Sequence, residues 1–383
     1  VLVLHHVERD LETVFALDFG CGRFVLGELD LVLGRDVVHV EIAQQPAKVL
    51  RGDLAYGNHT LRHVFDRERG RSGFGPANDD LLAIRPEVRE ALASGRAIVA
   101  LESTIIAHGL PHPENLAVAR DLEATVRAEG AVPATIALGD GRLRIGLDDG
   151  QLQELATAKS VIKVSRRDMA TVLAGRKLGA TTVAGTMLAA YLAGIRVFAT
   201  GGIGGVHRGA ERTFDISADL TELAATPVAV ISAGVKSILD IRLTLERLET
   251  LGVPVVVNGS DDFPSFFSRT SGLPAPRRVD GPAEIAKVMN AAWHQLGLSC
   301  GVSVANPVPV QFEVPASEIS GAIEQALADL RARGIEGQDV TPFLLARVRE
   351  VTGGRSLDAD LALVRNNAAT AAAVAVEYVK LVG

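Results

Sequence analysis

The sequence is poor in cysteine and in aromatic residues. Its 383 residues include two cysteines, Cys21 and Cys300, and one tryptophan, and aromatic residues make up only 4% of the chain. Two cysteines cannot form the disulfide framework of a small secreted domain, so we expect a reducing, cytoplasmic location. Because aromatic side chains are scarce, Ala, Val, Leu and Ile must form most of the core, and a hydrophobic content of 48% allows this.

Several other features are missing. No apolar run reaches the roughly 18 residues that a membrane span requires, and charged residues such as Glu8, Arg9 and Asp10 interrupt the start where a secretory leader would lie. The net charge of −7 argues against nucleic acid as a partner. No Walker motif is present, and counting the dinucleotide fingerprint from Gly202 puts His207 at the third glycine position. These absences leave a globular protein for which neither nucleic-acid binding nor nucleotide triphosphate chemistry has support in the sequence.

Residues 1–80 differ in composition from the rest. They hold five of the nine histidines, and 51–80 is rich in Arg, Gly and Asp and ends in a linker-like Arg-Gly-Arg-Ser-Gly-Phe-Gly-Pro run. His59 and His63 are four residues apart but lack the glutamate of a zinc-protease motif, so a metal site is not favoured here. Residues 31–42 could form one or two short strands. We expect residues 1–80 to be a poorly ordered extension or the result of a start assigned too far upstream, because the chain begins with Val.

From residue 81 to 383, short apolar runs alternate with helical patterns, which is typical of an α/β protein. Strands are predicted at 97–101, 161–164, 228–232, 253–257 and 301–305, and helices at 86–94, 113–129, 150–158, 169–177, 182–193, 219–225, 237–251, 282–296, 316–331, 341–351 and 358–381. Gly139-Asp140-Gly141 predicts a hairpin between 134–138 and 142–147. We therefore predict a single α/β/α domain over 81–383 with a mostly parallel, partly mixed sheet.

The most distinctive stretch is a glycine-rich loop that follows the apolar residues 195–199. Five of the nine residues 201–209 are glycine. Such a loop can bring backbone N–H groups close to a ligand, and we expect its glycines to supply the positive φ angles of a tight turn. His207, Arg208, Asp215 and Asp219 follow within a few residues, which favours a binding site over a simple turn.

Two charged residues follow predicted buried strands. Glu102 comes directly after 97–101, where a carboxylate could serve as a general acid, because burial raises the pKa of a carboxyl; a surface or capping acid is the alternative. Lys236 follows 228–232. A desolvated lysine can act as an amine nucleophile and form an imine with a sugar aldehyde, whereas an ordinary solvated lysine is the alternative reading.

Other candidates suit a phosphate or a metal. Lys163, Arg166 and Arg167 lie at the end of a predicted strand and could bind a phosphate, or simply be solvated charges. Asp215 and Asp219 are four residues apart, so one helical turn would place both carboxylates on one face, as Mg²⁺ or Mn²⁺ prefers. Alternatively, they complement the dipole at a helix N-terminus.

Together these segments resemble the pseudouridine-5′-phosphate glycosidase family, also called indigoidine synthase A-like. The resemblance covers about residues 83–383. It is carried by ordered blocks at 99–106, 130–137, 163–168, 179–184, 197–210, 213–220, 233–240, 304–307, 341–348 and 352–354. The family cleaves the C–C glycosidic bond of pseudouridine 5′-phosphate reversibly, giving uracil and ribose 5-phosphate, and is typically a homotrimer.

The resemblance implies roles for individual residues. Lys236 resembles the imine-forming nucleophile and Glu102 the proton donor, while Asp215 resembles the residue tied to a divalent metal, expected to be Mn²⁺. The residues that resemble substrate contacts are Lys163, the backbone at Val183, Ser217, Ala218 and Asp219, with His207 in the same pocket. Two alternatives remain open: a Schiff-base lyase or aldolase acting on another sugar phosphate, and a non-catalytic binding subunit.

Two positions depart from the family pattern. Asn258-Gly259 stands where relatives usually carry a glycine-tyrosine pair, a change that we expect to affect only a loop. Asp360 falls where an asparagine is expected to line the site, so it would add a charge near the substrate. Residues 1–80 have no counterpart that the resemblance explains.

Overall fold

The chain forms two compact units, Val1–Asn78 and Asp79–Gly383, which we describe separately. The computed structural model describes the backbone of six strands between residues 3 and 55, the residues 78–335 and the residues 340–383, with side chains from residue 80 onward. In the first unit the strands form two antiparallel three-stranded sheets: β1 (Val3–Arg9), β2 (Glu12–Phe19) and β3 (Gly22–Leu26); and β4 (Leu29–Leu33), β5 (Val37–Ile42) and β6 (Leu50–Ala55).

The strands expected within residues 31–42 are therefore confirmed as β4 and β5. The linker-like run, His59 and His63 lie outside the described residues, and the expectation of a poorly ordered extension remains a prediction.

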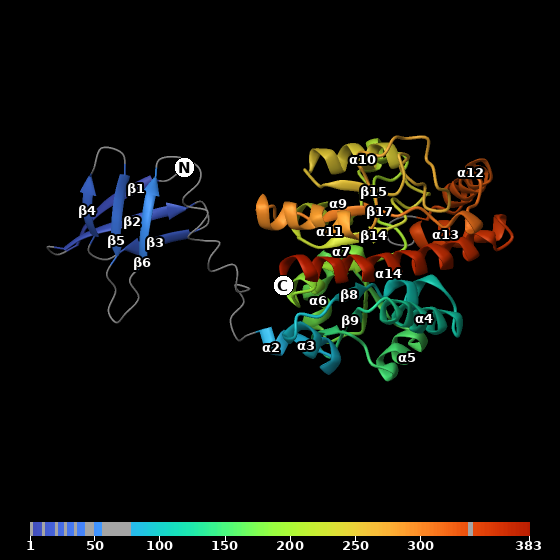
Figure 1. The fold of residues 1–383 in the computed structure, drawn as a ribbon, viewed down its shortest axis with the longest axis horizontal. Coiled ribbons are helices and arrows are strands. Elements are labelled where there is room, and N and C mark those ends of the chain that lie inside the picture. Colours follow the sequence, from blue (N-terminus) through green and yellow to red (C-terminus); the bar gives the residue numbers. More distant parts are fainter. Residues whose placement is uncertain are drawn as a thin grey trace. The chain divides into compact units, whose positions relative to one another are not determined.

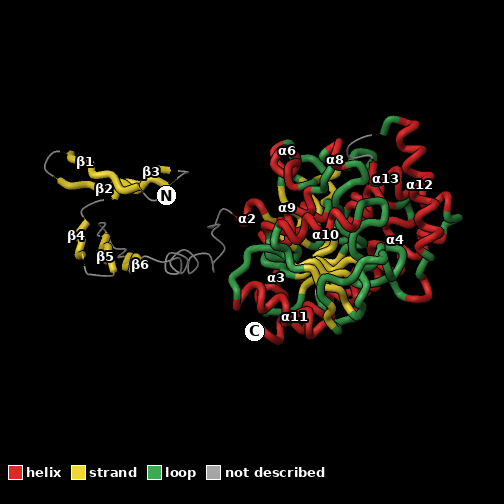
Figure 2. Tube along the Cα trace, turned by 90° about the horizontal axis from the view of Figure 1, so that it is seen from above, coloured by secondary structure: helices red, strands yellow, loops and turns green. Residues whose placement is uncertain are grey.

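The second unit is built on one eleven-stranded sheet, as the alternating pattern predicts, and its strands gather at the centre with helices around them (Figure 2). The order is β11-β12-β9-β8-β13-β14-β17-β15-β16, with β10 paired to β9 and β7 to β10. The bounds are β7 (Leu82–Ile84), β8 (Ile98–Leu101), β9 (Val132–Gly139), β10 (Arg142–Ile145), β11 (Ile162–Val164), β12 (Gly179–Thr181), β13 (Val197–Ala199), β14 (Ala229–Ser232), β15 (Val255–Asn258), β16 (Arg278–Val279) and β17 (Val302–Ala305).

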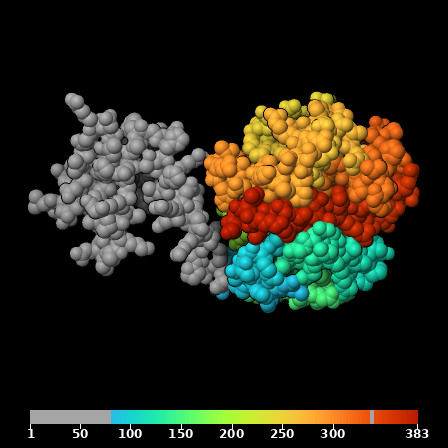
Figure 3. Space-filling view, viewed as in Figure 1, coloured from blue at the N-terminus to red at the C-terminus, as the bar shows by residue number. Residues whose placement is uncertain are grey.

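Helices cover both faces of this sheet, which gives the predicted α/β/α layers. The long α14 (Arg355–Val382) runs across the front of the sheet in Figure 1, packed on β8, β13 and β14 and flanked by α4 (Glu114–Ala128) and α11 (Pro282–Asn290). In Figure 3 it forms a red band between the yellow and orange segments on one side and the cyan and green segments on the other, all of which precede it in the chain. The remaining helices are α2 (Asn78–Leu81), α3 (Pro86–Ala93), α5 (Asp149–Thr157), α6 (Met169–Ala174), α7 (Val183–Leu192), α8 (Ala210–Thr213), α9 (Ala218–Ala225), α10 (Ile241–Thr250), α12 (Ala316–Arg333) and α13 (Val340–Val351).

Alanine allows α14 to approach the sheet closely. Ala368, Ala371, Ala372 and Ala375 are all buried, and their small side chains let the helix backbone lie near the strands. No helix among residues 78–335 and 340–383 is long and apolar enough to cross a membrane.

Several helix boundaries differ from the prediction, and the two largest differences are at residues 237 and 296. The helix expected from residue 237 begins at Ile241, because the Asp240 side chain accepts the Leu243 N–H and caps the helix there. The helix that begins at Pro282 changes to a π-helix over Ala291–Gln295.

The predicted hairpin is present, with β9 antiparallel to β10. Its turn residues Asp140 (φ 55°) and Gly141 (φ 75°) both have the positive φ that a type I′ hairpin turn requires.

Strand β9 also explains how distant strand ends meet. Its first half pairs in parallel with β8, up to Leu101 opposite Thr135, and its second half pairs antiparallel with β12, with Ala180 opposite Ala137. Since β10 occupies the other edge over 136–139, β8 and β12 point toward each other along one edge of β9. Their carboxyl ends therefore meet at the middle of β9.

The meeting point is closed by buried hydrogen bonds. The hydroxyls of Ser103 and Thr181 both donate to the Ile136 carbonyl, at 2.6 and 2.9 Å, and the Thr181 N–H donates to Ser103 Oγ at 2.9 Å. We call these three residues the β9 junction. It places the residues after β8 and the residues after β12 beside each other.

Candidate active site

A cavity of ≈ 1100 Å³ lies beside the β9 junction. Its wall contains all nine residues to which the family resemblance gives a role: Glu102, Lys163, Val183, His207, Asp215, Ser217, Ala218, Asp219 and Lys236. They lie in β11 or in the segments that follow the strands, where α/β sheets bind ligands. The carboxyl ends of β8, β11, β12, β13 and β14 supply them. The structure thus brings the predicted residues into one place, although it does not by itself test their roles.

Glu102 is held by two hydroxyl groups. Thr104 donates to one oxygen of its carboxyl group and Thr200 to the other. Thr104 follows Glu102 in its own loop, whereas Thr200 comes from the end of β13. Both donors therefore fix the direction in which this carboxyl group faces the cavity.

Lys236 is fixed at its backbone. It follows β14 through Ala233 and Gly234, and its N–H donates to the Ile203 carbonyl in the glycine loop at 3.1 Å. Its side chain is partly buried and lines the same cavity as Gly201, Gly202 and Gly204. The amine therefore does not lie on an outer surface, where the solvated alternative would place it.

Two histidines beside Lys163 are kept neutral. Burial lowers the pKa of His207; Asp215, whose Oδ2 lies 3.7 Å from Nδ1, opposes this, while Lys236 and Lys163 reinforce it. Burial and then Lys163 lower the pKa of His108. Both imidazoles can therefore accept or donate a hydrogen bond near pH 7 without adding positive charge.

The glycines of the loop serve a different purpose from the predicted one. Gly201, Gly202, Gly204 and Gly205 do not have positive φ, and only Gly209 does (φ 89°). They are needed because the loop is crowded. A Cβ on Gly204 would lie 2.2 Å from Ser217 Oγ, and one on Gly202 would lie 2.5 Å from the Phe266 ring.

The expected helical pair of Asp215 and Asp219 is also wrong. Helix α9 begins only at Ala218, and Asp215 precedes it in an extended segment, so the two carboxylates do not share a helical face. Asp219 is buried and accepts the Gly204 N–H at 2.8 Å and the Ala184 N–H at 3.0 Å. It ties the glycine loop to the start of α7, while Asp215 stays half-exposed in the cavity wall.

The two neighbouring arginines have different positions. Arg167 lines the cavity, as a phosphate-binding residue would. Arg166 instead donates to both oxygens of the fully buried Glu222 side chain, at 2.8 and 2.7 Å. Its predicted phosphate contact is therefore not supported, because its guanidinium neutralises a buried charge.

Sequence reasoning missed the wall formed by α13 and by the loop after β15. Phe266 and Phe267 line the cavity, and Phe266 has an unusual positive φ of 58°. From α13 come Thr341, Pro342, Leu345, Ala346, Arg349 and Glu350. Only the weak spacing signal of 342, 345, 346 and 349 on one helix face could have indicated this wall.

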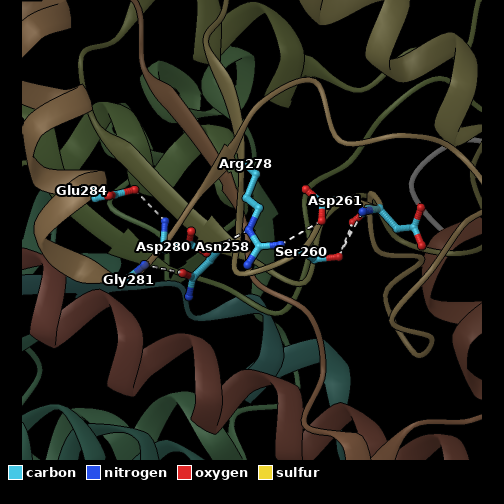
Figure 4. Close-up of polar contacts among 8 residues, drawn as sticks. Asn258, Ser260, Asp261, Arg278, Asp280, Gly281 and Glu284 are labelled. Carbon is cyan, nitrogen blue, oxygen red and sulfur yellow. Dashed lines mark hydrogen bonds and ion pairs between the residues drawn. The ribbon is translucent and has the colours of Figure 1, made fainter.

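Asn258 belongs to a chain of amide groups and does more than shape a loop. It ends β15, its Nδ2 donates to Asn306 Oδ1 at 2.9 Å, and its Oδ1 accepts the Gly281 N–H at 3.0 Å, as Figure 4 shows for Gly281. Asn306 donates to Asn367 Oδ1 at 3.1 Å, and Asn367 donates to the Thr200 carbonyl at 2.8 Å. We expected Asn258 to affect only its own loop. The structure differs, because this series of amide hydrogen bonds connects Asn258 to Thr200, whose hydroxyl group donates to Glu102.

Asp360 lies in the cavity wall, as expected from its position in the sequence. Burial raises the pKa of its carboxyl group to about 7, the positive charge of Lys236 opposes the rise, and the Glu102 carboxylate adds to it. The residue is half-buried and its side chain lines the cavity. Asp360, Lys236 and Glu102 therefore form one electrostatic cluster.

The fold and the cavity define the class of protein. It is an α/β protein with a charged small-molecule site at converging strand ends. Residues 87–377 match the family model described as indigoidine synthase A like protein, and the chain belongs to this family.

The relatives and solved structures agree with this assignment. The chain is 62% identical over 301 residues to a pseudouridine-5′-phosphate glycosidase of Nocardioides sp., which covers 79% of this chain and 98% of the relative, and 58% identical over 309 residues to that of Deinococcus radiodurans, covering 80% and 98%. Among solved structures, it is similar to the prealnumycin C-glycosynthase AlnA in complex with ribulose 5-phosphate (TM-score 0.73, 40% identity, covering 79% of this chain and 98% of the other). It is also similar to an indigoidine synthase A-like protein of Thermotoga maritima (TM-score 0.71, 35% identity, covering 78% and 97%). The relatives at this level of identity are enzymes.

Proposed function

We propose that this chain cleaves the C–C glycosidic bond of pseudouridine 5′-phosphate, giving uracil and ribose 5-phosphate through an imine at Lys236. The observation that carries the proposal is the joint position of Lys236 and Glu102 in one cavity, where both act on Asp360. The names of the relatives support the substrate, and the sugar phosphate bound by AlnA supports its chemical class.

The C1′–C5 bond of the substrate joins two carbons, so its cleavage cannot use a heteroatom leaving group. An amine nucleophile and a proton donor suit such a bond. The sugar ring opens as the C1′–O4′ bond breaks, and the Lys236 amine bonds to C1′ in its place while one proton of the amine passes to O4′. As the C1′–C5 bond breaks, its electrons stay on uracil C5, which takes a proton delivered by Glu102. Water then adds to the C1′=N bond, releases ribose 5-phosphate and restores the amine. Lys163 and Arg167 would hold the phosphate, with Val183, Ser217 and Ala218 positioning the sugar.

A divalent metal is the second part of the proposal. The part of the chain with described side chains holds no group of three or more His, Cys, Asp or Glu side chains that could bind a metal. Asp215, half-exposed and 3.7 Å from His207, instead fits a hydrated ion held by one carboxylate, water and substrate oxygens, as Mg²⁺ and Mn²⁺ accept. Such an ion would supply positive charge near the substrate. A homotrimer, which the resemblance implies, and a cytoplasmic location, which the low cysteine content favours, complete the proposal.

An assay of uracil release tests this proposal. The protein is treated with EDTA, dialysed, and assayed with pseudouridine 5′-phosphate with and without added Mn²⁺. We expect release of uracil that depends on Mn²⁺, and borohydride should trap ribose 5-phosphate on Lys236. No uracil release from pseudouridine 5′-phosphate under either condition would overturn the substrate assignment. Trapping of a different sugar phosphate would then favour the lyase or aldolase alternative.

A further inference from the structure

The cavity holds a third group that can exchange protons, and the mechanism above does not use it. Helix α14 presents Ser356, Asp360 and Val364 to the cavity at a spacing of four residues, so Asp360 lies in the middle of one helix face. Lys236 and Glu102 line the same cavity, and the charges of both act on the Asp360 carboxyl group.

The two carboxyl groups near Lys236 differ in what they already bind. Both oxygens of Glu102 accept hydroxyl hydrogens, from Thr104 and Thr200. In contrast, no hydrogen bond or ion pair from the residues with described side chains engages Asp360. Its oxygens are therefore available to the amine or to a ligand.

Lys236 needs such a partner. An ammonium cannot attack carbon, so a proton must leave Nζ before the C–N bond forms, and it must return when the amine is released. A proton acceptor works best when its pKa lies near the operating pH, and burial places Asp360 at about 7.

We propose that Asp360 is a catalytic base and acid for Lys236, building on the function proposed above. The Asp360 carboxylate takes one proton from Lys236 Nζ, which leaves a neutral amine and a neutral carboxylic acid. The amine then bonds to C1′. Water then adds to the C1′=N bond and gives one proton to the Glu102 carboxylate. The C–N bond breaks as the proton of the new hydroxyl group moves to the nitrogen, and the released amine takes its proton back from Asp360 to become the ammonium.

Other titratable groups line the same cavity from the strand ends, the loops that follow them, the glycine loop and α13. They are His108, Lys163, Arg167, His207, Asp215, Asp219, Arg349 and Glu350. Among the described groups, only Lys236 and Glu102 act on the Asp360 carboxyl. The ionisation of Asp360 should therefore appear as a separate step in the pH profile.

The test compares Asp360→Asn with Asp358→Asn, a matched control on the exposed side of the same helix. The first readout is kcat between pH 5.5 and 9.5 at saturating pseudouridine 5′-phosphate. The second is the rate at which cyanoborohydride traps ribose 5-phosphate on Lys236. For the wild type we expect both rates to rise with pH around a midpoint near 7. In Asp360→Asn this rise should disappear, with kcat at pH 8 at least tenfold lower and KM within threefold. Asp358→Asn should behave as the wild type.

A wild-type midpoint and a kcat within twofold in Asp360→Asn would overturn the proposal. If that variant fails to fold, Asp360→Glu decides: a retained rise with a displaced midpoint supports the proposal, and its loss overturns it. A wild type that releases no uracil would refute the substrate, while the trapping rates would still report on Asp360.

Discussion

The cavity has two walls that differ in how they are held. The loop wall, residues 199–219, is fixed by hydrogen bonds within the fold, such as those from the Gly204 N–H to Asp219 and from the Val206 N–H to Thr244. The helical wall, residues 340–364, consists of α13, the start of α14 and the turn between them, and the helices set the spacing of its side chains. This wall is less crowded: a Cβ on Gly353, in the turn, would meet no atom within 4 Å.

This difference indicates where change is tolerated. A Cβ on Gly202, Gly204 or Gly205 would clash with neighbouring side chains, so this part of the loop preserves the position of the reacting groups. The helical wall can change side chains without moving its backbone, and it carries Asp360, the residue that departs from the family pattern. Four predictions test this contrast.

Removing the amine should have the largest effect. In Lys236→Ala no imine can form, so we expect uracil release to fall at least 10³-fold, about 4 kcal/mol in the activation barrier. The measurement is kcat together with borohydride trapping. Lys287→Ala, an exposed lysine on α11, serves as the control and should keep full activity. If Lys236→Ala keeps the turnover of the wild type, the imine mechanism is wrong.

Adding one carbon to the loop wall should be costly. In Gly204→Ala the new Cβ would lie 2.2 Å from Ser217 Oγ and 2.7 Å from Asp219 Oδ2, so we expect a loss of about 3 kcal/mol of unfolding free energy. Denaturant unfolding measures it. Ala346→Ser makes a similar addition on the helical wall, where the residue is exposed, and should change stability by less than about 0.5 kcal/mol. Equal costs in the two variants would show that the walls do not differ.

Asp360 should destabilise its own wall at alkaline pH. Its carboxyl group binds a proton more tightly in the folded state, with a pKa of about 7 against 3.8, so stability is present at low pH and is lost as the pH rises from about 4 to 7. Asp360→Asn lacks this loss. At pH 8 Asp360→Asn should be more stable than the wild type by about 2 kcal/mol. This is less than the whole pKa shift of Asp360 would give, because solvent in the cavity screens its charge. Thermal melts at pH 5 and pH 8 measure the difference, which should shrink at pH 5. A difference that does not depend on pH would contradict it.

The two arginines beside β11 should separate stability from binding. Arg166→Ala leaves the buried Glu222 carboxylate without its cation, and because Arg166 is half-exposed we expect a loss of about 1–2 kcal/mol with KM unchanged. Arg167→Ala should leave stability unchanged and raise KM about threefold to tenfold. Urea melts and initial rates on both variants check this. A rise in KM for Arg166→Ala alone would reverse the assignment.

The sequence predicted the layers and the site better than it predicted how the site is built. Apolar runs followed by Glu102 and Lys236 were enough to find strand ends, because a buried strand must deliver its next polar residue at the sheet edge. The sequence could not show that Gly204 is needed for space, since that depends on Ser217 folding back against it. Nor could it show that Asp219 accepts hydrogen bonds from α7 and the glycine loop, or that Asn367 donates to the Thr200 carbonyl, because these bonds join segments distant in the sequence.

The β9 junction implies a limit on how this site can diversify. The distance between the residues after β8 and those after β12 is set by the few residues of one strand, and an insertion there would turn every following side chain to the opposite face. A larger or smaller ligand can therefore be accommodated only by remodelling α13 and the turn into α14. We expect substrate range within the family to follow the length and side chains of that helical segment.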